Sequence, residues 1–217
     1  VHSADAVISS IPIWNMPGIT HGAVSTYFRS AAGRFDASWA AITVYLALDG
    51  TPALPSAYMQ VFLDEDVPFV HSRSLFCTVS LPTDTQKAPA GQCTVTISTH
   101  ARSEDWEGLT AHEAASRKQM VLDAIMGVLR RRVPELAQLP VLHAEAGTPS
   151  TWERYTLRHR GFVGGIPHDI AKPLITLPPN HTPFRGLYMI GDSVFPGQGT
   201  PAVMLGAWNT VARIFAA

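Results

Sequence analysis

Three stretches of the chain carry the apolar and β-branched residues that are typical of strands. Residues 40–48 are almost continuously apolar, whereas residues 75–81 and 93–99 show apolar and polar positions in alternation. The segment 82–92 between the last two contains two prolines and a glycine. These residues favour a hairpin loop over a crossover helix, so we expect antiparallel neighbours here.

One long helix is expected from residue 110 onward. Thr110 and Glu113 have the spacing of a capping box, and apolar residues then recur at helical spacing up to residue 133. Three arginines at 130–132 fall where the helix dipole favours cations, and Pro134 ends the pattern. We interpret the arginines as a solvated surface rather than an anion site.

The last thirty residues have the pattern of a strand, a glycine turn and a helix. The apolar run 187–190 fits a buried parallel strand, and Gly191 follows where the backbone must turn. Asp192 then stands at the carboxyl end of the strand. Ligands of open α/β sheets bind at this edge, so Asp192 could accept a hydrogen bond from a sugar hydroxyl. The alternative is an ordinary strand-to-helix turn with an incidental aspartate.

The helix expected at residues 202–215 is apolar on nearly every side, so we expect it to be buried. Gly197 and Gly199 suit a tight loop before it, and Pro201 suits its first turn. Its free N–H groups would face an anionic or electron-rich acceptor, such as a phosphate or the carbonyl edge of a flavin.

Two further segments contribute to the expected organisation. Residues 5–11 read as a strand. Residues 147–169 are dense in glycine, aromatic residues and arginine, and we interpret them as an extended segment that lines a site; the alternative is a long surface connection. Arg154 and Arg158 of this segment could offset charge on a reduced flavin or its phosphates, or equally pair with Glu153 and Asp169 in solution. His159 and His168 could transfer protons or simply lie at the surface.

Composition narrows the classes of function. The 217 residues are 46% hydrophobic, which is enough for a substantial core, and the formal net charge of −1 argues against nucleic acid as a partner. No apolar run reaches the roughly 20 residues that span a bilayer. The two cysteines, Cys77 and Cys93, are expected to be reduced and buried in a cytoplasmic protein. The nine histidines lack metal-ligand spacing, so no metal site is expected.

Residues 187–214, "LYMIGDSVFPGQGTPAVMLGAWNTVARI", resemble the C-terminal flavin-binding motif of the phytoene desaturase and carotenoid isomerase family of FAD-dependent oxidoreductases. Three other segments are similar, in the same order, to parts of the C-terminal half of those enzymes: "ADAVISSIP" at 4–12, "SEDWEGL" at 103–109 and "GTPSTWERYTLRHRGFVGGIP" at 147–167.

The resemblance implies a mixed α/β (α+β) fold. A substrate-binding domain built on an antiparallel sheet with helices would occupy residues 19–160. Residues 1–18 would supply a strand of a Rossmann-type FAD-binding domain, and residues 161–217 would return to that domain.

The resemblance also implies site residues. In the family's pattern Gly191 and Asp192 would meet the ribityl and pyrophosphate region of FAD, and residues 199–203 would approach the flavin ring. The cofactor-binding set is Gly191, Asp192, Gly197, Gln198, Gly199, Thr200, Pro201, Ala202 and Val203. An apolar polyene substrate would need aromatic lining, for which the candidates are Trp152, Tyr155, Phe162, Phe195 and Trp208; each could equally be a core aromatic. No catalytic residue is identified.

One departure from the family's pattern matters. Family members begin with a strand, a GxGxxG turn and a helix that hold the ADP moiety, and this sequence contains no such unit. We therefore expect FAD to bind fully only with an N-terminal half that supplies it. The expected function is the C-terminal portion of a flavin-dependent oxidoreductase that desaturates or isomerises a carotenoid. The alternative is a flavin-free module that binds an apolar ligand or a partner protein. Contact with a membrane surface stays open, because carotenoids reside in bilayers.

Overall fold

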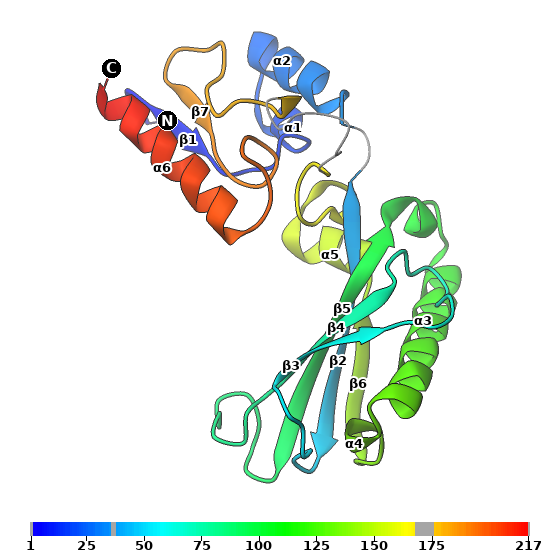
Figure 1. The fold of residues 1–217 in the computed structure, drawn as a ribbon. Helices are drawn as coiled ribbons and strands as arrows, with labels where there is room; N and C mark the ends of the chain where they lie inside the picture. Colours follow the sequence, from blue (N-terminus) through cyan, green and yellow to red (C-terminus); the bar gives the residue numbers. More distant parts are fainter. Residues whose placement is uncertain (1, 36–37, 168–175, 217) are drawn as a thin grey trace. The chain divides into compact units, whose positions relative to one another are not determined.

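The computed structural model describes residues 2–35, 38–167 and 176–216. It divides into two compact units, which are coloured along the sequence in Figure 1. Unit 1 combines Val1–Trp39 with Leu157–Ala217, and unit 2 is the continuous segment Ala40–Thr156. The functions predicted for residues 1–18, 19–160 and 161–217 stay predictions, since the division into units carries no information about ligands.

Unit 2 is built on a five-stranded sheet with the strand order β3-β4-β5-β2-β6. The strands are β2 (Trp39–Asp49), β3 (Tyr58–Phe62), β4 (Ser74–Val79), β5 (Gln92–Arg102) and β6 (Val141–Gly147). Cys77 of β4 lies opposite Ile97 of β5 in an antiparallel ladder, so the hairpin predicted around residues 82–92 is confirmed. Buried and more exposed residues alternate along β4 and β5, because one face of each strand packs in the core.

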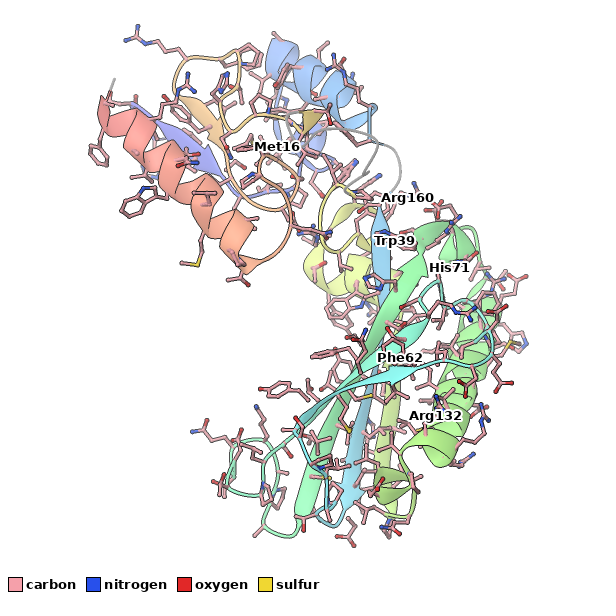
Figure 2. All side chains as sticks on the ribbon, viewed as in Figure 1. Met16, Trp39, Phe62, His71, Arg132 and Arg160 are labelled. Atoms are coloured by element: carbon pink, nitrogen blue, oxygen red, sulfur yellow. The ribbon has the colours of Figure 1, made fainter. Side chains whose placement is uncertain are left out.

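A long helix packs against this sheet (Figure 1). The helix α3 (Ala111–Arg132) begins with the predicted capping box, because Thr110 and Glu113 bond reciprocally. Its buried residues, among them Ile125 and Leu129, join the sheet in one hydrophobic cluster. Arg132, labelled in Figure 2, forms an exposed ion pair with Asp64, as expected for a solvated arginine run.

Three short elements complete unit 2. They are the 3-10 helix η1 (Ser103–Trp106) and the helices α4 (Pro134–Ala137) and α5 (Pro149–Thr156). The expectation of an extended segment from residue 147 is therefore wrong for α5. Thr148 and Pro149 start a helix there: Pro149 occupies its first position, and the Trp152 N–H donates to the Thr148 carbonyl at 3.0 Å.

Unit 1 contains a two-stranded parallel sheet and several helices. The elements are β1 (Val7–Ser9), β7 (Leu187–Met189), α1 (Met16–Ile19), α2 (Gly22–Ala32), η2 (His159–Gly161) and α6 (Thr200–Ala216). Val7 pairs with Leu187 in parallel register, as predicted for the run 187–190, although Met189 is the only residue of β7 that is buried. Met16, Phe28 and Phe162 are in the core of this unit, and Figure 2 labels Met16.

The helix α6 differs from its expected burial. Only Gly206 and Thr210 are buried, whereas Trp208 is 76% and Phe215 is 87% exposed. The prediction of a buried helix is wrong, because the described part of unit 1 packs against one narrow stripe of α6. Gly206 lies in that stripe, where an added Cβ would come 3.1 Å from the Phe195 carbonyl oxygen.

The fold is mixed α/β, with an antiparallel sheet in one unit and a small parallel sheet in the other. The Rossmann-type character of unit 1 stays a proposal. Among the described residues, no helix is both long and apolar enough to cross a membrane.

Candidate functional site

The candidate site is the segment that joins β7 to α6 in unit 1. Gly191 has a φ of 105°, so the chain turns there as predicted and brings Asp192 just beyond the end of the strand. All nine predicted cofactor-binding residues lie between Gly191 and the first turn of α6. Most are partly or fully exposed, and Gly197 is buried.

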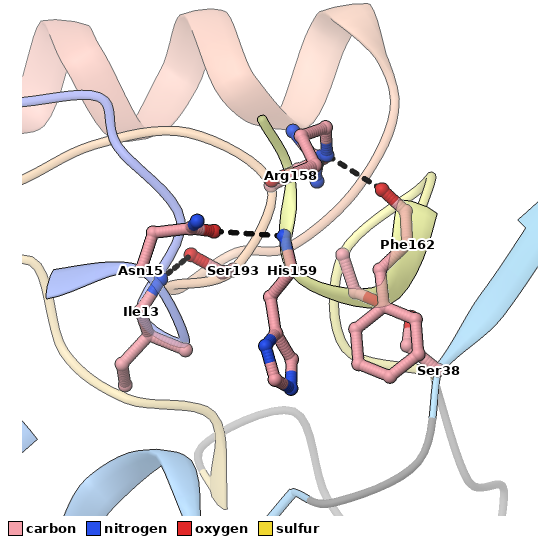
Figure 3. Close-up of polar contacts among 9 residues, drawn as sticks. Ile13, Asn15, Ser38, Arg158, His159, Phe162 and Ser193 are labelled. Carbon is pink, nitrogen blue, oxygen red and sulfur yellow. Dashed lines mark hydrogen bonds and ion pairs between the residues drawn. The ribbon is translucent and has the colours of Figure 1, made fainter. Parts of the chain in front are cut away.

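Asp192 is held by an arginine from a distant part of the sequence. The Arg158 guanidinium donates from Nη2 to Asp192 Oδ2 at 2.7 Å, and the side chains are 25% and 22% exposed. The Arg158 Nε donates to the Phe162 carbonyl at 2.6 Å (Figure 3). Two fixed bonds orient the guanidinium, so the carboxylate faces a rigid cation rather than a mobile one.

Asn15 fixes the backbone on both sides of Arg158. Its Nδ2 donates to the Leu157 carbonyl at 2.7 Å, and its Oδ1 accepts from the His159 N–H at 3.1 Å (Figure 3). Leu157 has a φ of 58° and Arg160 a φ of 54°, a left-handed conformation that L-residues adopt at a cost. The two bonds of Asn15 help to hold this conformation.

Two glycines allow the segment after η2 to pack directly on the candidate site. Gly164 and Gly165 both have positive φ values, of 78° and 71°. A Cβ added at Gly165 would overlap with the Asp192 carbonyl oxygen, and one at Gly164 would overlap with the Gln198 side chain. The Gly165 carbonyl in turn accepts a hydrogen bond from Ser38 Oγ. At Gly165 the neighbour is backbone and leaves no room for a Cβ, whereas at Gly164 the Gln198 side chain would have to move.

A third contact comes from the segment after β1. The buried Ser193 Oγ accepts from the Ile13 N–H at 3.0 Å (Figure 3). Residues on opposite ends of the sequence, 180 positions apart, therefore meet at the turn that carries Asp192.

The first turn of α6 is open at its N-terminus. Gly197 and Gly199 have φ values of 108° and 92°, and α6 begins at Thr200 with Pro201 in its first turn, as expected. An added Cβ at Gly199 would meet nothing within 4 Å. Pro201 has no N–H and the Val203 N–H donates to the Gly199 carbonyl at 3.0 Å, so Thr200 and Ala202 supply the N–H groups of this first turn. Such groups have no partners within the helix, so this end of α6 favours an anionic or electron-rich acceptor.

The structure distributes the predicted substrate-lining residues over both units. Trp152 and Tyr155 lie on α5 in unit 2 and line a cavity of about 300 Å³. Phe162 is buried in unit 1, with its ring 5.1 Å from that of Trp14 in a T-shaped contact. Phe195 lines a second cavity, of about 390 Å³, beside α6. Trp208 is exposed on α6.

The other predicted polar candidates have ordinary surroundings. The His159 ring lies 5.6 Å from the Phe162 ring, and the Arg154 guanidinium lies 5.6 Å from the centre of the Tyr155 ring. His168 and Asp169 lie outside the described residues. Within residues 2–35, 38–167 and 176–216, no group of three His, Cys, Asp or Glu residues could hold a metal ion.

The cysteines are buried and free, as predicted. Burial raises the pKa of the Cys77 thiol to about 11, so the thiol is protonated at neutral pH. A protonated, buried thiol is not a nucleophile, and neither cysteine contributes to the candidate site.

Sequence reasoning missed two residues that hold the site, Asn15 and Ser193. Asn15 precedes the first helix and has the residue type of an N-cap, but its side chain makes no cap bond. Its partners lie more than 140 residues away. Local spacing contains no signal for such a contact.

Comparison with known proteins supports a family assignment. No family model matches the chain. The chain is 34% identical to the chloroplastic prolycopene isomerase of Daucus carota over 143 residues, which is 66% of this chain and 23% of that protein. It is 37% identical to prolycopene isomerase 2 of an Oncidium hybrid cultivar over 144 residues, 66% of this chain and 24% of that protein. It is 28% identical to the phytoene desaturase of Phycomyces blakesleeanus over 173 residues, 75% of this chain and 28% of that protein.

The names of these relatives, prolycopene isomerase and phytoene desaturase, are those of proteins of carotenoid metabolism. The chain belongs to the carotenoid desaturase and isomerase family, and its similarity is to the C-terminal part of that family's proteins. The family prediction from residues 187–214 is thereby confirmed. The matched region spans about a quarter of the length of the curated relatives.

Proposed function

We propose that this chain is the C-terminal portion of a flavin-dependent oxidoreductase that desaturates or isomerises a long apolar polyene of the carotenoid class. One observation carries the proposal: Asp192 and the open N-terminus of α6 lie on one short segment, residues 187–214, and the sequence of that segment resembles the family's flavin-binding motif. The relatives to which this chain is similar include one named as an isomerase and one named as a desaturase, so the proposal covers both reactions.

The residues of the candidate site fit an FAD molecule. Gly199 presents exposed backbone with free space beside it, which suits the close approach of a planar ring. The N–H groups at the start of α6 would donate to a carbonyl oxygen of that ring. A carboxylate has about four lone-pair sites. Asp192 would therefore accept a bond from a ribityl hydroxyl while it still accepts from Arg158.

FAD, when bound, would supply the redox chemistry: the oxidised flavin would accept a hydride from the polyene in a desaturation, and the reduced flavin would serve an isomerisation. This chain's residues would bind and orient it. Arg158 would keep the Asp192 carboxylate in one direction, and the glycine pair at 164–165 would keep the turn at Asp192 in place. Trp152 and Tyr155 in unit 2, and Phe195 in unit 1, would each supply apolar surface beside a cavity of their own unit.

The proposal includes a partner segment for the ADP moiety. The printed sequence does not contain the ADP-binding unit, in which a strand, a GxGxxG turn and a helix follow one another. The curated relatives are about four times as long as the matched region. A unit of that kind, in the same or another polypeptide, would complete the cofactor site. Peripheral contact with a membrane is part of the proposal, since a polyene substrate resides in bilayers.

A flavin-free binding module is the second candidate. The exposed apolar side chains of α6, which include Met204, Trp208 and Phe215, favour it, as does the cavity of about 390 Å³ beside this helix. Both features suit an apolar ligand or a partner protein without any flavin.

An FAD titration separates the two candidates. The purified chain and the same chain joined to the GxGxxG unit of a curated relative would each be titrated with FAD, and bound flavin measured by its perturbed absorption spectrum and co-elution. We expect the joined protein to retain FAD. Asp192→Ala should weaken its affinity by about tenfold, which corresponds to one charge-assisted hydrogen bond.

Asp66→Ala is the matched control, because Asp66 is an almost fully exposed carboxylate of unit 2 that also pairs with an arginine. It should leave FAD affinity unchanged. If the joined protein binds no FAD, or if Asp192→Ala binds it as tightly as the parent, the proposed flavin site is wrong.

A further inference from the structure

A cavity of about 300 Å³ lies in unit 2, between the strands β2 and β6 and the helix α5. Its walls combine three aromatic side chains with a few polar ones. The residues that matter are Thr43, Tyr45, Glu145, Gly147, Trp152 and Tyr155. Every one of them belongs to the continuous segment of unit 2, so the cavity is complete within that unit.

Two polar atoms of the cavity walls lack hydrogen bonds. Thr43 Oγ1 and Trp152 Nε1 are shielded from solvent, and neither has a hydrogen-bond partner among the residues that the structure describes. Thr43 is 6% exposed. A buried donor or acceptor without a partner destabilises the folded state, and such groups are rare in proteins.

The local structure keeps the Thr43 hydroxyl without a partner. Thr43 lies opposite Gly147 in the ladder between β2 and β6, and a Cβ at Gly147 would come 2.7 Å from Thr43 Oγ1. Glycine therefore leaves space beside the hydroxyl. The hydroxyl group of Thr151, a residue of α5 that also lines the cavity, pairs with that of Thr148 at 3.2 Å.

The chemistry of the walls defines the ligand. The rings of Tyr45, Trp152 and Tyr155 favour an apolar or conjugated body. An indole N–H only donates, so the ligand must offer an acceptor, and a threonine hydroxyl can bond to the same atom. The Glu145 carboxylate at the cavity pairs with Lys118 at 3.4 Å, so neither of these two charges is left to attract a charged ligand. The acceptor is therefore a neutral oxygen.

We propose that this cavity binds the end of an elongated apolar molecule that carries an alcohol, aldehyde or ketone oxygen. That oxygen accepts a hydrogen bond from Trp152 Nε1 and pairs with Thr43 Oγ1. Since both atoms are shielded without ligand, binding includes a side-chain rotation that opens them to the cavity. The inference extends the proposed function. It rests on that function in one respect only, the apolar class of the ligand.

A matched pair of C15 isoprenoids tests the site. The ¹⁵N-labelled chain would be titrated with the alcohol farnesol and with the hydrocarbon farnesene, and the indole N–H resonances followed by NMR. We expect farnesol to bind about tenfold more tightly, as one net hydrogen bond allows, and to shift the Trp152 signal downfield. The Trp106 indole is the internal control, since its N–H is likewise buried without a partner but does not line this cavity.

Two variants remove one polar group each: Thr43→Val keeps the shape of the side chain, and Trp152→Phe keeps an aromatic ring of smaller size. Trp152→Phe and Thr43→Val should each bring the affinity ratio of farnesol to farnesene close to one. Equal binding of the two ligands by the parent chain overturns the inference and leaves the apolar ligand class standing. Binding of neither ligand overturns both.

A measurement without ligand gives an independent test. Thr43→Val should raise the urea midpoint of unfolding of the ligand-free chain, because it replaces an unpaired buried hydroxyl with a methyl group of similar size. The same variant should lose the preference for farnesol. A lower midpoint would show that the hydroxyl has a partner in the folded chain, and the inference would be wrong.

Discussion

The helices α3 and α6 show how weakly apolar composition alone determines burial. The sequence of α6 is the more apolar, yet most of its large side chains are exposed, including Trp208 and Phe215. The sequence of α3 is more polar, but its apolar residues form one stripe that the sheet of unit 2 covers. Whether a helix is buried depends on the elements that pack on it. Its own composition determines only how much free energy of folding is gained when they do.

Two leucines, one in each helix, give the largest expected effect. Leu129 of α3 is 2% exposed and Leu205 of α6 is 50% exposed. Leu129→Ala should lower the free energy of unfolding by about 3 kcal/mol, since it leaves a cavity in a packed core. Leu205→Ala should lower it by less than about 1 kcal/mol. Urea unfolding followed by circular dichroism measures both, and equal losses would contradict the contrast between the helices.

The close packing at the candidate site predicts the next largest effect. Gly165→Ala should destabilise unit 1 by about 2 kcal/mol or more, because the new methyl group overlaps with the Asp192 carbonyl and the φ of 71° is left-handed. Gly22→Ala is the control, with a φ of 57° and nothing within 4 Å of the added Cβ. It should cost only the conformational term of about 1 kcal/mol. Thermal unfolding distinguishes the two, and equal shifts would argue against the packing contact.

The ion pair at the site should have a smaller effect. A double-mutant cycle with Arg158→Gln and Asp192→Asn should give a coupling free energy of about 1 kcal/mol in low salt, decreasing as salt screens the partly exposed pair. The ion pair of Arg132 with Asp64, whose side chains are more exposed, is the comparison and should give less. A coupling near zero for the first pair would mean that Arg158 does not hold Asp192 in solution.

The smallest effect is expected at the start of α3. Hydrogen bonds from the side chain and then the backbone of Thr110 lower the pKa of Glu113, with a further contribution from the charge of Arg117. A carboxyl whose pKa is lower in the folded than in the unfolded chain adds stability above the unfolded pKa, about 4.3, and loses it as pH falls through the folded pKa. Glu113→Gln should therefore flatten the loss of stability in acid. Unfolding midpoints between about pH 2 and 6 test this, and an unchanged slope would contradict it.

Features fixed by neighbouring residues could be predicted from the sequence. The capping box needs only Thr110 and Glu113, and the hairpin needs only the turn residues at 82–92. The helix α5 also had a local signal, Thr148 before Pro149, but the glycines around it favoured an extended segment. The glycine turn and the start of α6 followed from the same kind of local pattern.

Features that depend on distant residues could not be predicted. Asn15 bonds to His159, and Ile13 to Ser193, across separations of 144 and 180 residues. The spacing of residues along the chain records no such pairing. Exposure of α6 was missed for the same reason, because a helix's own sequence does not say which of its faces other segments will cover.

The pairing of β1 with β7 has a consequence for the order of folding. Val7 and Leu187 are 180 residues apart, with all of unit 2 between them. During synthesis unit 2 leaves the ribosome whole and can fold on its own contacts, while β1 waits for a partner made much later. Closing so long a loop is slow compared with forming a hairpin, and a folded unit 2 shortens the flexible chain that must be closed. Folding of unit 2 therefore shortens the flexible chain between the two segments of unit 1, which precede and follow it in the sequence, and so favours the pairing of β1 with β7.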